Sequence, residues 1–534
     1  MSENTDVNMN IPMVKAIRQA YKEGQEDEAL EPIVAVDSAG HPVGRFQDGD
    51  SVIFYDIRGE REIEITESLT DPEFNHFQTD KGIRLHYVTM IEYSSALDVK
   101  VAFKPEGEIK NTLTDAVTKA GMKLLKITES EKAIHVGYFL NGKREERFSG
   151  EEIIIVPSPE GVSNYALTPE MSASEVADKI CANLDNPEFP AIVANMSNVD
   201  VVGHIEDQQA VLKAVQSVDE ALGKVYEACK QKGVTLIITA DHGTVEEWFY
   251  PDGAVNTGHT KNPVPFVLAD FSEKNPSRWT LKKKGELIDV APTVLELLGL
   301  QKPEEMTGSC LIENFPQADP SDRKVLLLIL DGWGIRKEER GNLIQKARTD
   351  FFDRIWRQFP HAELEASGEA VGMPSGTVGN SEAGHLHIGA GRRIFLDRVK
   401  IDNSIEDGTM FQNSAFLWAM ENAKEQNKAL HLLGIVSHYS SHGTIDHLFA
   451  LLRMAKNLGV KKVFVHALLG RRGERPESGA IYVAKVAEMC QELSLGEVAT
   501  VIGRFWALDR EFNWDRVEKT YRALIHGEGT PVPR

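Results

Sequence analysis

The sequence is poor in cysteine, in long apolar runs and in positive charge. The four cysteines, Cys181, Cys229, Cys310 and Cys490, lie far apart without a CxxC pair, so they give no disulfide or zinc framework and fit a reducing compartment. No stretch approaches the roughly 20 apolar residues that a membrane-spanning helix needs. The opening MSENTDVNMNIP has neither the basic nor the apolar region of a secretory signal. We therefore expect a cytoplasmic protein that does not bind membranes.

Acidic residues outnumber basic ones by 81 to 59, which gives a formal net charge of −22. Such a chain repels nucleic acid unless it carries a local basic patch, so we expect no nucleic-acid partner. It also repels phosphorylated metabolites. A function on phosphates therefore requires clustered arginines and metal ions, and the sequence can be searched for both.

The chain has 534 residues, too many for one compact core, which predicts two or more domains. Short aliphatic runs alternate with amphipathic stretches, a pattern typical of α/β domains with mainly parallel sheets. The clearest expected strand is Val325–Leu330, and the others are Ala191–Ala194, Val234–Ile238, Val463–Val465 and Val498–Ile502. The polar residues 313–323 include two prolines and predict a linker.

Aspartates and histidines follow three of these strands, where open parallel sheets bind ligands. They are Asp331, Asp200 with His204, and Asp241 with His242, and His259 comes farther along the chain. Any one aspartate is explained equally well as a helix N-cap, and a lone histidine is more often structural. Three strands that end in this way favour a metal site instead. Carboxylate and imidazole ligands together suit Mn²⁺, with Mg²⁺, Zn²⁺ or Co²⁺ as other choices.

A glycine-rich segment at residues 372–385 contains Ser381 at a position that suits a strand-to-helix turn. A serine hydroxyl is a weak nucleophile until a base or a metal ion activates it. An ordinary helix cap explains the same pattern equally well.

Basic residues follow four further strands. They are His442, Arg472 beside Arg471, Arg504 with Arg510, and Arg58 with Arg61. Arginine matches phosphate and carboxylate oxygens with two parallel hydrogen bonds. Each arginine alone is explained as a solvated surface charge, but together they predict an anion pocket in an acidic protein.

Five ordered motifs then resemble cofactor-independent phosphoglycerate mutase, a family of the alkaline phosphatase-like superfamily. They are DVVGH at 200–204, TADHG at 239–243, GHTKNPVPF at 258–266, DGWG at 331–334 and GNSEAGH at 379–385. The likeness extends over most of the chain and implies an isomerase of glycolysis that needs two divalent metal ions but no 2,3-bisphosphoglycerate. Its substrate would be a small phosphorylated acid, and we expect a monomer.

The resemblance also implies a role for each matching residue. One metal would be held by Asp331, Ser381, Asp241 and His242, and the other by Asp200, His204 and His259. Ser381 would take the phosphoryl group, which Lys132 would stabilise. His442 and the arginines Arg472, Arg504, Arg510, Arg58 and Arg61 would bind the substrate from a second domain. Closure of the two domains would exclude water.

The motifs stand in an unusual order, because the family begins with DGWG and this chain reaches it only at residue 331. The chain therefore resembles a circular permutation of the family. We expect a metal domain over 107–312 and 324–396, joined by the linker 313–323, and a substrate domain over 1–106 and 397–534.

The substrate half departs from the family pattern. HAFxDGRD becomes HALLGRRG, so that Gly473 replaces an acid that contacts the substrate, and Glu474 or Asp56 is a candidate to compensate. NFRxDR becomes DIRGER and keeps Arg58 and Arg61. Two alternatives therefore stay open. One is a phosphatase, phosphomutase or phosphoryl or phosphonyl transferase for another small acid. The other is a metabolite-binding protein without turnover.

Overall fold

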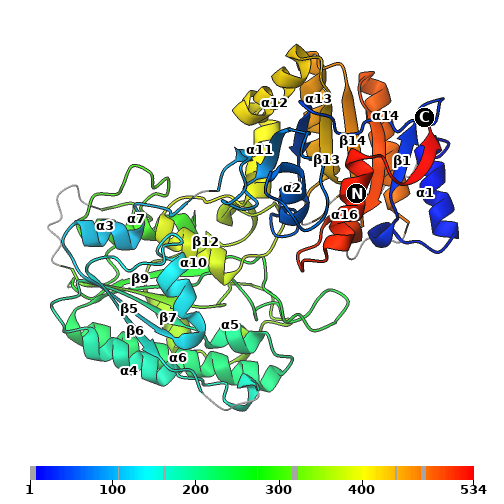
Figure 1. Cartoon of the computed structure of the whole chain (residues 1–534). Coiled ribbons are helices and arrows are strands. Elements are labelled where there is room, and N and C mark those ends of the chain that lie inside the picture. Colours follow the sequence, from blue (N-terminus) through cyan, green and yellow to red (C-terminus); the bar gives the residue numbers. More distant parts are fainter. Residues whose placement is uncertain are drawn as a thin grey trace. The chain divides into compact units, whose positions relative to one another are not determined.

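The computed structural model describes residues 8–534 except 106, 160–163, 274, 316–322, 439, 441 and 471–476. The chain forms two compact units. Unit 1 combines Met1–Pro105 with Asp397–Arg534, and unit 2 is Glu106–Leu396. The boundaries expected from the sequence are 106/107 and 396/397, and the two units meet at 105/106 and 396/397. Each unit is an α/β structure, which confirms the predicted fold class (Figure 1).

Unit 2 is built on an eight-stranded sheet with the order β10-β12-β9-β8-β11-β7-β5-β6. The strands from β8 to β6 run parallel, and β9 pairs antiparallel with both β8 and β12. The bounds of the strands are β5 Leu124–Glu129, β6 Glu151–Val156, β7 Ala191–Met196, β8 Thr235–Thr239, β9 Val264–Asp270, β10 Lys284–Glu286, β11 Val325–Leu330 and β12 His361–Glu365.

Helices cover both faces of this sheet (Figure 1). One group contains α4 Ala173–Asn183, α5 Asn198–Gly203, α6 Gln208–Lys232, α8 Leu343–Lys346 and α9 Asp350–Gln358. The other contains α3 Leu113–Lys119, α7 Val290–Leu297 and α10 Ser381–Ala390. The longest, α6, begins where the Asp207 side chain accepts hydrogen bonds from two backbone N–H groups and ends at Gly233, whose φ of 68° favours glycine.

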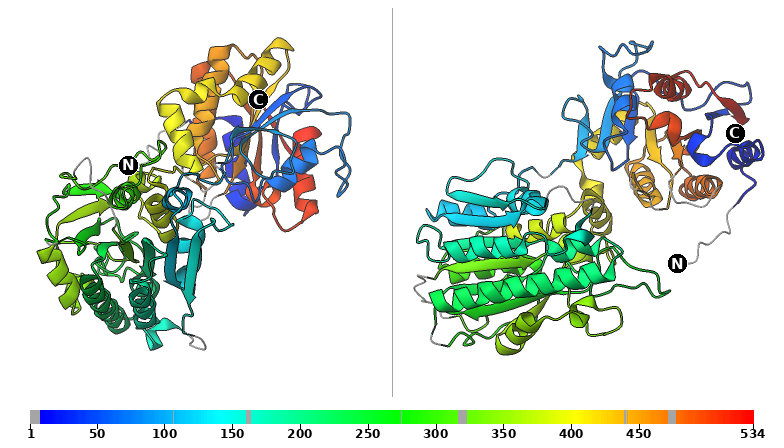
Figure 2. Two further views of the ribbon diagram at one scale, coloured as in Figure 1. Left: turned by 90° about the vertical axis from the view of Figure 1, so that its left-hand side faces the viewer. Right: turned by 90° about the horizontal axis from the view of Figure 1, so that it is seen from below.

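Unit 1 has a second eight-stranded sheet with the order β16-β1-β15-β14-β13-β2-β3-β4, parallel except for the β1–β15 pair. Its strands are β1 Ile33–Val36, β2 Ser51–Phe54, β3 His86–Ile91, β4 Lys100–Phe103, β13 Leu430–Ile435, β14 Val463–Leu469, β15 Glu497–Gly503 and β16 Thr530–Pro533. Its helices are α1 Pro12–Lys22, α2 Ile63–Thr70, α11 Asp397–Glu406, α12 Ser414–Glu425, α13 Ile445–Leu458, α14 Gly479–Leu493, α15 Arg504–Ala507 and α16 Trp514–Ile525. Figure 2 gives two further views of the elements.

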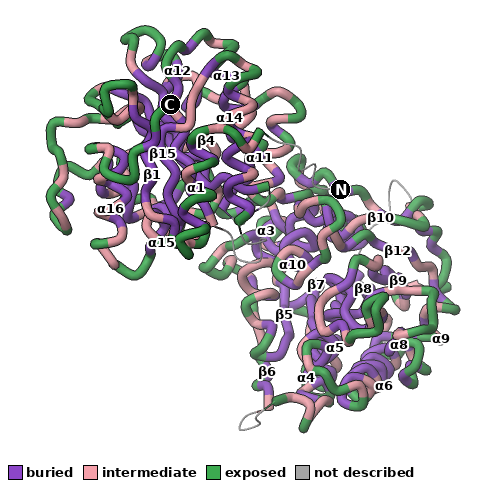
Figure 3. The backbone as a smooth tube through the Cα atoms, turned by 90° about the vertical axis from the view of Figure 1, so that its right-hand side faces the viewer, coloured by how far each residue is buried: buried purple, intermediate pink, exposed green. Residues whose placement is uncertain are grey.

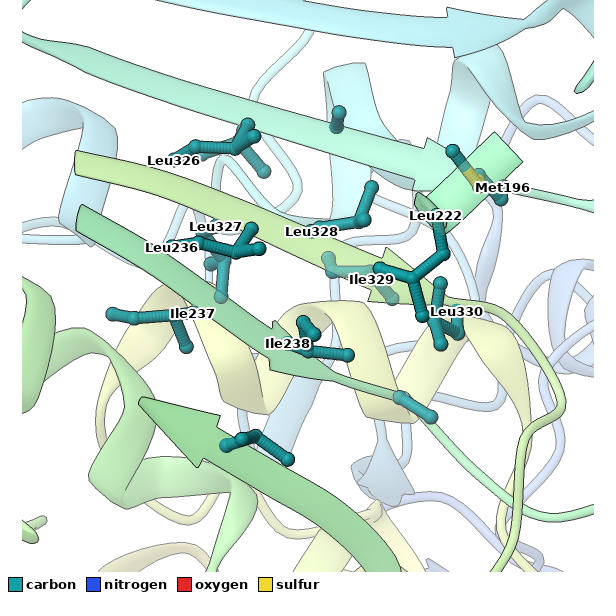
Figure 4. Close-up of a cluster of buried hydrophobic side chains, with 14 of the residues drawn as sticks. Met196, Leu222, Leu236, Ile237, Ile238, Leu326, Leu327, Leu328, Ile329 and Leu330 are labelled. Carbon is teal, nitrogen blue, oxygen red and sulfur yellow. The ribbon is translucent and has the colours of Figure 1, made fainter. Parts of the chain in front are cut away.

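Each unit has its own hydrophobic core, and buried residues concentrate in the strands and on the inward helix faces (Figure 3). In unit 2 the side chains of β7, β8 and β11 cluster with Leu222 of α6 (Figure 4). All six residues of β11 are buried, as expected for a central parallel strand covered on both faces.

The predicted linker, 313–323, lies mostly outside the described residues. Its described ends are attached to unit 2. The Glu313 N–H donates to the Thr280 carbonyl at 2.8 Å, and the buried Arg323 pairs with Asp270 at 3.2 Å.

All four cysteines are free, in accordance with the absence of CxxC pairs. Within the described residues, no helix has both the length and the apolarity to cross a membrane.

Candidate active site

The order of strands in unit 2 determines where the polar residues gather. β11 pairs in parallel with β7 on one side and β8 on the other, with Leu330 opposite Met196 and Ile329 opposite Thr239. The carboxyl ends of the three strands therefore share one sheet edge. Asp331 follows β11, Asp241 follows β8, and Asp200 lies in α5 after β7, so residues distant in sequence meet at this edge.

Three buried aspartates surround one buried lysine at this edge. Asp200 is 4% exposed, and Asp241 and Asp331 are fully buried. Lys132 Nζ lies 2.6 Å from Asp200 Oδ2 and 3.0 Å from Asp331 Oδ1. Burial alone would lower the pKa of Lys132, but the three aspartates outweigh it and raise that pKa. When all three carboxylates are ionised they exceed the one ammonium by two negative charges, and bound cations would compensate this buried charge.

Two histidines present bare acceptor atoms to Asp200. The Nδ1 atoms of His204 and His259 contact the carbonyls of Thr257 and Gly379 at 2.8 and 2.9 Å. Because carbonyls only accept, both Nδ1 atoms carry a proton, and in the neutral rings both Nε2 atoms carry a lone pair that a metal ion can use. The Nε2 atoms lie 3.2 Å apart and 3.3 and 3.1 Å from Asp200 Oδ1. Three converging acceptors fit a divalent cation.

The remaining predicted ligands form an adjacent group. His242 Nε2 lies 2.9 Å from Ser381 Oγ, 3.5 Å from Asp241 Oδ2 and 3.6 Å from Asp331 Oδ1. The same nitrogen lies 3.6 Å from Asp200 Oδ1, so His242 stands between the two sets. All seven residues expected to hold metal, and Lys132, are thus brought together, which fits two divalent ions.

Ser381 is the first residue of α10, where Asn380 caps the helix by accepting a hydrogen bond from the Ala383 N–H at 2.8 Å. Its Oγ lies 2.6 Å from Lys132 Nζ. Gly384 allows α10 to approach the strand end, since an added Cβ would lie 2.5 Å from the carbonyl oxygen of Asp241. The helix therefore presents its first hydroxyl to the carboxylates.

Two further residues of this site, His385 and Asn195, were given no role from the sequence, although His385 stands in the GNSEAGH motif. Fully buried His385 contacts Asp241 Oδ2 at 3.2 Å and the Ser381 carbonyl at 2.9 Å through Nδ1. Its Nε2 lies 3.0 Å from Asn195 Nδ2, and the same amide donates to Asp331 Oδ2 at 2.9 Å. One ligand atom each from Asp241, Asp331 and His385 lie within 4.8 Å of one another, as do one each from Asp200, His242 and His259. Because both nitrogens of His385 are engaged, it orients the two aspartates.

Glu246 connects the loops that carry His242 and His259, and no sequence pattern indicated a role for it. Fully buried, it accepts hydrogen bonds from the Thr244 N–H at 2.9 Å, from the Thr260 hydroxyl and from Asn262 Nδ2 at 3.1 Å. Thr244 follows His242 and Thr260 follows His259. A single carboxylate therefore fixes both ligand loops, and nothing in the local sequence distinguishes it from an exposed glutamate.

The predicted substrate-binding residues that the structure describes belong to unit 1. His442 and Arg504 are buried, and their side chains meet at 3.1 Å. Arg58 and Arg510 are exposed and converge on Glu60 Oε2 at 3.3 and 2.8 Å. Arg61 donates to the Leu508 carbonyl at 3.1 Å. Arg472, Gly473 and Glu474 lie outside the described residues.

Comparison with known proteins relates the chain to phosphoglycerate mutases. The 2,3-bisphosphoglycerate-independent phosphoglycerate mutase of Clostridium perfringens strain SM101 is 42% identical over 301 residues, which are 56% of this chain and 57% of that protein. The protein of the same name from Methanococcoides burtonii is 40% identical over 305 residues, 56% of this chain and 58% of that one. The chain thus spans just over half the length of these relatives.

A solved structure, that of Leishmania mexicana phosphoglycerate mutase at low cobalt concentration, has 27% identity and a TM-score of 0.36 over 52% of this chain and 53% of that one. Residues 401–533 match the BPG-independent PGAM N-terminus (iPGM_N). Residues 4–302, more than half of the chain, match the Metalloenzyme superfamily. Asp331 and Ser381 lie between the two matches, and their assignment rests on the geometry above. From the extent of the longer match, this chain belongs to the Metalloenzyme superfamily.

Proposed function

We propose that the chain interconverts 3-phosphoglycerate and 2-phosphoglycerate through a phosphoserine at Ser381. The observation that carries this proposal is the position of Ser381 Oγ, 2.6 Å from Lys132 Nζ and 2.9 Å from His242 Nε2, beside three buried aspartates. The relatives named as phosphoglycerate mutases support the same reaction.

In this reaction Ser381 Oγ loses its proton and attacks the phosphorus, and the bond between phosphorus and the 3-oxygen of the glycerate breaks as that oxygen takes up a proton. The 2-hydroxyl of the same glycerate then loses its proton and attacks the phosphoserine, and the bond to Ser381 Oγ breaks as the serine regains a proton. His242 Nε2 lies 2.9 Å from Ser381 Oγ and fixes its position. The ammonium of Lys132 compensates negative charge on the phosphoryl oxygens.

Two divalent ions, which we propose to be Mn²⁺, would lower the pKa of the Ser381 hydroxyl and neutralise phosphoryl charge. Asp200, His204 and His259 would hold one, and Asp331, Asp241, His242 and Ser381 the other. In this assignment unit 2 transfers the phosphoryl group, while Arg58, Arg61, Arg504, Arg510, Arg472 and His442 of unit 1 bind the glycerate. We further propose that the protein acts in glycolysis, as a monomer in the cytoplasm.

A second candidate is transfer or hydrolysis of a phosphoryl or phosphonyl group on another small acid. The replacement of the family acid by Gly473 favours it. Phosphorus NMR with Mn²⁺ and 3-phosphoglycerate, beside an EDTA control, separates the two. We expect 2-phosphoglycerate to form only with the metal and without free phosphate. Release of phosphate instead would support the second candidate, and no reaction of any phosphoester would contradict both.

We also propose that the chain order is a circular permutation of the family order. The family model of the N-terminal part of BPG-independent PGAM (iPGM_N) matches residues 401–533, near the end of this chain. Strand β11, which comes after β7 and β8 in the sequence, pairs between them in the sheet. A variant that joins residue 534 to residue 8 through a short linker and opens the chain within 316–322 should keep mutase activity. Complete loss of activity in a folded variant of this kind would contradict the proposal.

A further inference from the structure

Unit 1 contains two buried carboxylic acids that the proposed reaction does not use, and they lie beside His442. Asp56 follows β2, Glu62 precedes α2, and His442 lies before α13. Both carboxylic acids are fully buried and His442 is 1% exposed. One oxygen or nitrogen from each lies within 4.8 Å of the others. Buried acids without a cation among them require an explanation.

The contact with Arg504 determines which atoms of this group carry protons. An arginine only donates, so His442 Nε2, 3.1 Å from the Arg504 guanidinium, accepts. The single proton of the neutral ring is therefore on Nδ1, which donates to Glu62 Oε1 at 2.6 Å. Glu62 Oε2 accepts from the Arg61 N–H at 3.1 Å. Both oxygens of Glu62 are thus acceptors, as in an ionised carboxylate.

Asp56 holds the remaining proton. Its Oδ1 accepts from the Ile435 N–H at 2.7 Å, whereas Oδ2 receives no donor from any described residue. Two neighbouring buried carboxyl groups do not both ionise. The geometry therefore assigns a proton to Asp56 Oδ2, from where it faces Glu62. A metal ion at this place would have to displace the proton between His442 and Glu62.

The surroundings keep this proton in place at neutral pH. Burial, and then the charge of Glu62, raise the pKa of Asp56 well above its usual range. Burial also raises the pKa of Glu62, but the hydrogen bond with Asp56 and the Arg61 N–H lower it and favour the ionised form. Burial, with the positive charge of Arg504, lowers the pKa of His442 to about 4. The other ionisable groups that face the three are Arg58, Arg61 and Arg504, the phenols of Tyr55, Tyr87 and Tyr93, and Glu28 beside Arg504.

Arg504 has donors to spare. It is 8% exposed, and in the described part of the chain His442 is the one acceptor within hydrogen-bond distance of its guanidinium. Four of its five N–H groups remain for a ligand. A largely desolvated guanidinium with free donors matches a carboxylate or phosphate group.

We propose that Asp56 and Glu62 are positioning residues that act through His442 to hold Arg504 for the anionic group of a small acid, and that the proton between the two acids links anion binding to pH. The inference rests on the proposed function and deepens it. When Asp56 loses its proton, the group gains one negative charge near the anion, so affinity falls as pH rises. A bound anion conversely raises the pKa of Asp56, so binding takes up a proton.

The test is calorimetric titration of the full-length, Mn²⁺-loaded protein with 3-phosphoglycerate from about pH 7 to about pH 9.5, in two buffers of different ionisation enthalpy. The phosphate is a dianion throughout this range. We expect the affinity of the wild type to fall by about tenfold per unit of pH at the high end, with proton uptake. Asp56→Asn should abolish this fall, because its amide donates to Glu62 and has no proton to lose. Glu62→Gln should move the fall to lower pH, because it removes the charge that, after burial, raises the pKa of Asp56.

The matched control is Asp50→Asn at the other end of β2. Asp50 is also buried beside a histidine, His431, at 3.2 Å, but lies outside this group, and its variant should keep the wild-type pH profile. Inorganic phosphate as a second probe separates the two proposals. If phosphate binding shows the same fall above about pH 8, where phosphate too is a dianion, but 3-phosphoglycerate is not converted, the mutase proposal fails and this one stands. Asp56→Asn or Glu62→Gln with a wild-type profile, or no anion binding at any pH, would overturn the inference.

Discussion

At the scale of single residues, the metal centre is defined by an excess of buried negative charge. Lys132 contributes the one ammonium among Asp200, Asp241 and Asp331. We predict that Lys132→Met raises the affinity for Mn²⁺ by at least about tenfold, because it removes a positive charge from beside the ions. Turnover should fall at the same time, because the phosphoryl oxygens lose a donor.

Calorimetric metal titration and the NMR assay measure the two effects on the same preparation. Lys302→Met is a suitable control, because Lys302 donates only to the carbonyls of Met306 and Gly308 among the described residues. It should leave the Mn²⁺ affinity unchanged. Weaker Mn²⁺ binding by Lys132→Met would contradict the account of the charge.

Some site residues could be predicted from the sequence, and others could not, for a physical reason. Asp331, Asp241 and Asp200 follow apolar strands, and parallel strands bring such residues to one edge. Glu246 gives no such signal, because its partners are contributed by folded loops. The proton of Asp56 is equally invisible, because it depends on burial and on Glu62. Asp56 was a candidate to contact the substrate, but it is fully buried.

At the scale of elements, the glycines of helix α10 determine how closely the helix packs against the residues that surround Ser381. In Gly384→Ala the new Cβ would lie 2.5 Å from the Asp241 carbonyl oxygen. We predict a loss of about 1–3 kcal/mol in the free energy of unfolding and weaker Mn²⁺ binding, since Asp241 must shift. Denaturant unfolding and metal titration are the measurements.

Gly389→Ala is the control on the same helix, where the new Cβ would lie 2.0 Å from the Leu140 carbonyl oxygen. It should destabilise the fold in the same way but change Mn²⁺ binding less, because Leu140 holds no ligand. An equal loss of Mn²⁺ affinity in both variants would show that the approach to Asp241 is not the cause.

Elements with an apolar run were predicted best. Val325–Leu330 was predicted with the bounds of β11, because a central strand buried on both faces is apolar throughout. For β14 and β15 the predicted strands, Val463–Val465 and Val498–Ile502, were shorter than Val463–Leu469 and Glu497–Gly503. The antiparallel strand β9 was not predicted as an element, since its pairing depends on β8 and β12.

At the scale of the whole molecule, the proposed metal ligands all belong to unit 2. Removal of Mn²⁺ by EDTA should therefore lower the unfolding temperature of unit 2 alone. Saturation at a hundred times the dissociation constant stabilises by about 2.7 kcal/mol per site. Differential scanning calorimetry resolves this as one moving and one fixed transition. Equal shifts of both transitions would contradict the assignment and would point to metal in unit 1 as well.

Length predicted two or more domains, because a chain of this size exceeds one core, and the alternation of apolar and amphipathic runs predicted α/β structure. The pairing of segments distant in sequence, such as β2 with β13, was not predicted. The expectation that residues 1–106 and 397–534 form one domain came from the resemblance, which carries the order of the motifs.

The central claim is that Ser381 becomes phosphorylated. Mass spectrometry of the acid-quenched protein, after brief mixing with Mn²⁺ and 3-phosphoglycerate, tests it most directly. The account predicts a phosphoryl group on the peptide that contains Ser381, absent with EDTA and absent from Ser381→Ala, whose turnover should fall by several orders of magnitude. Rapid mutase turnover in Ser381→Ala, or a phosphoryl group on another residue, would contradict it.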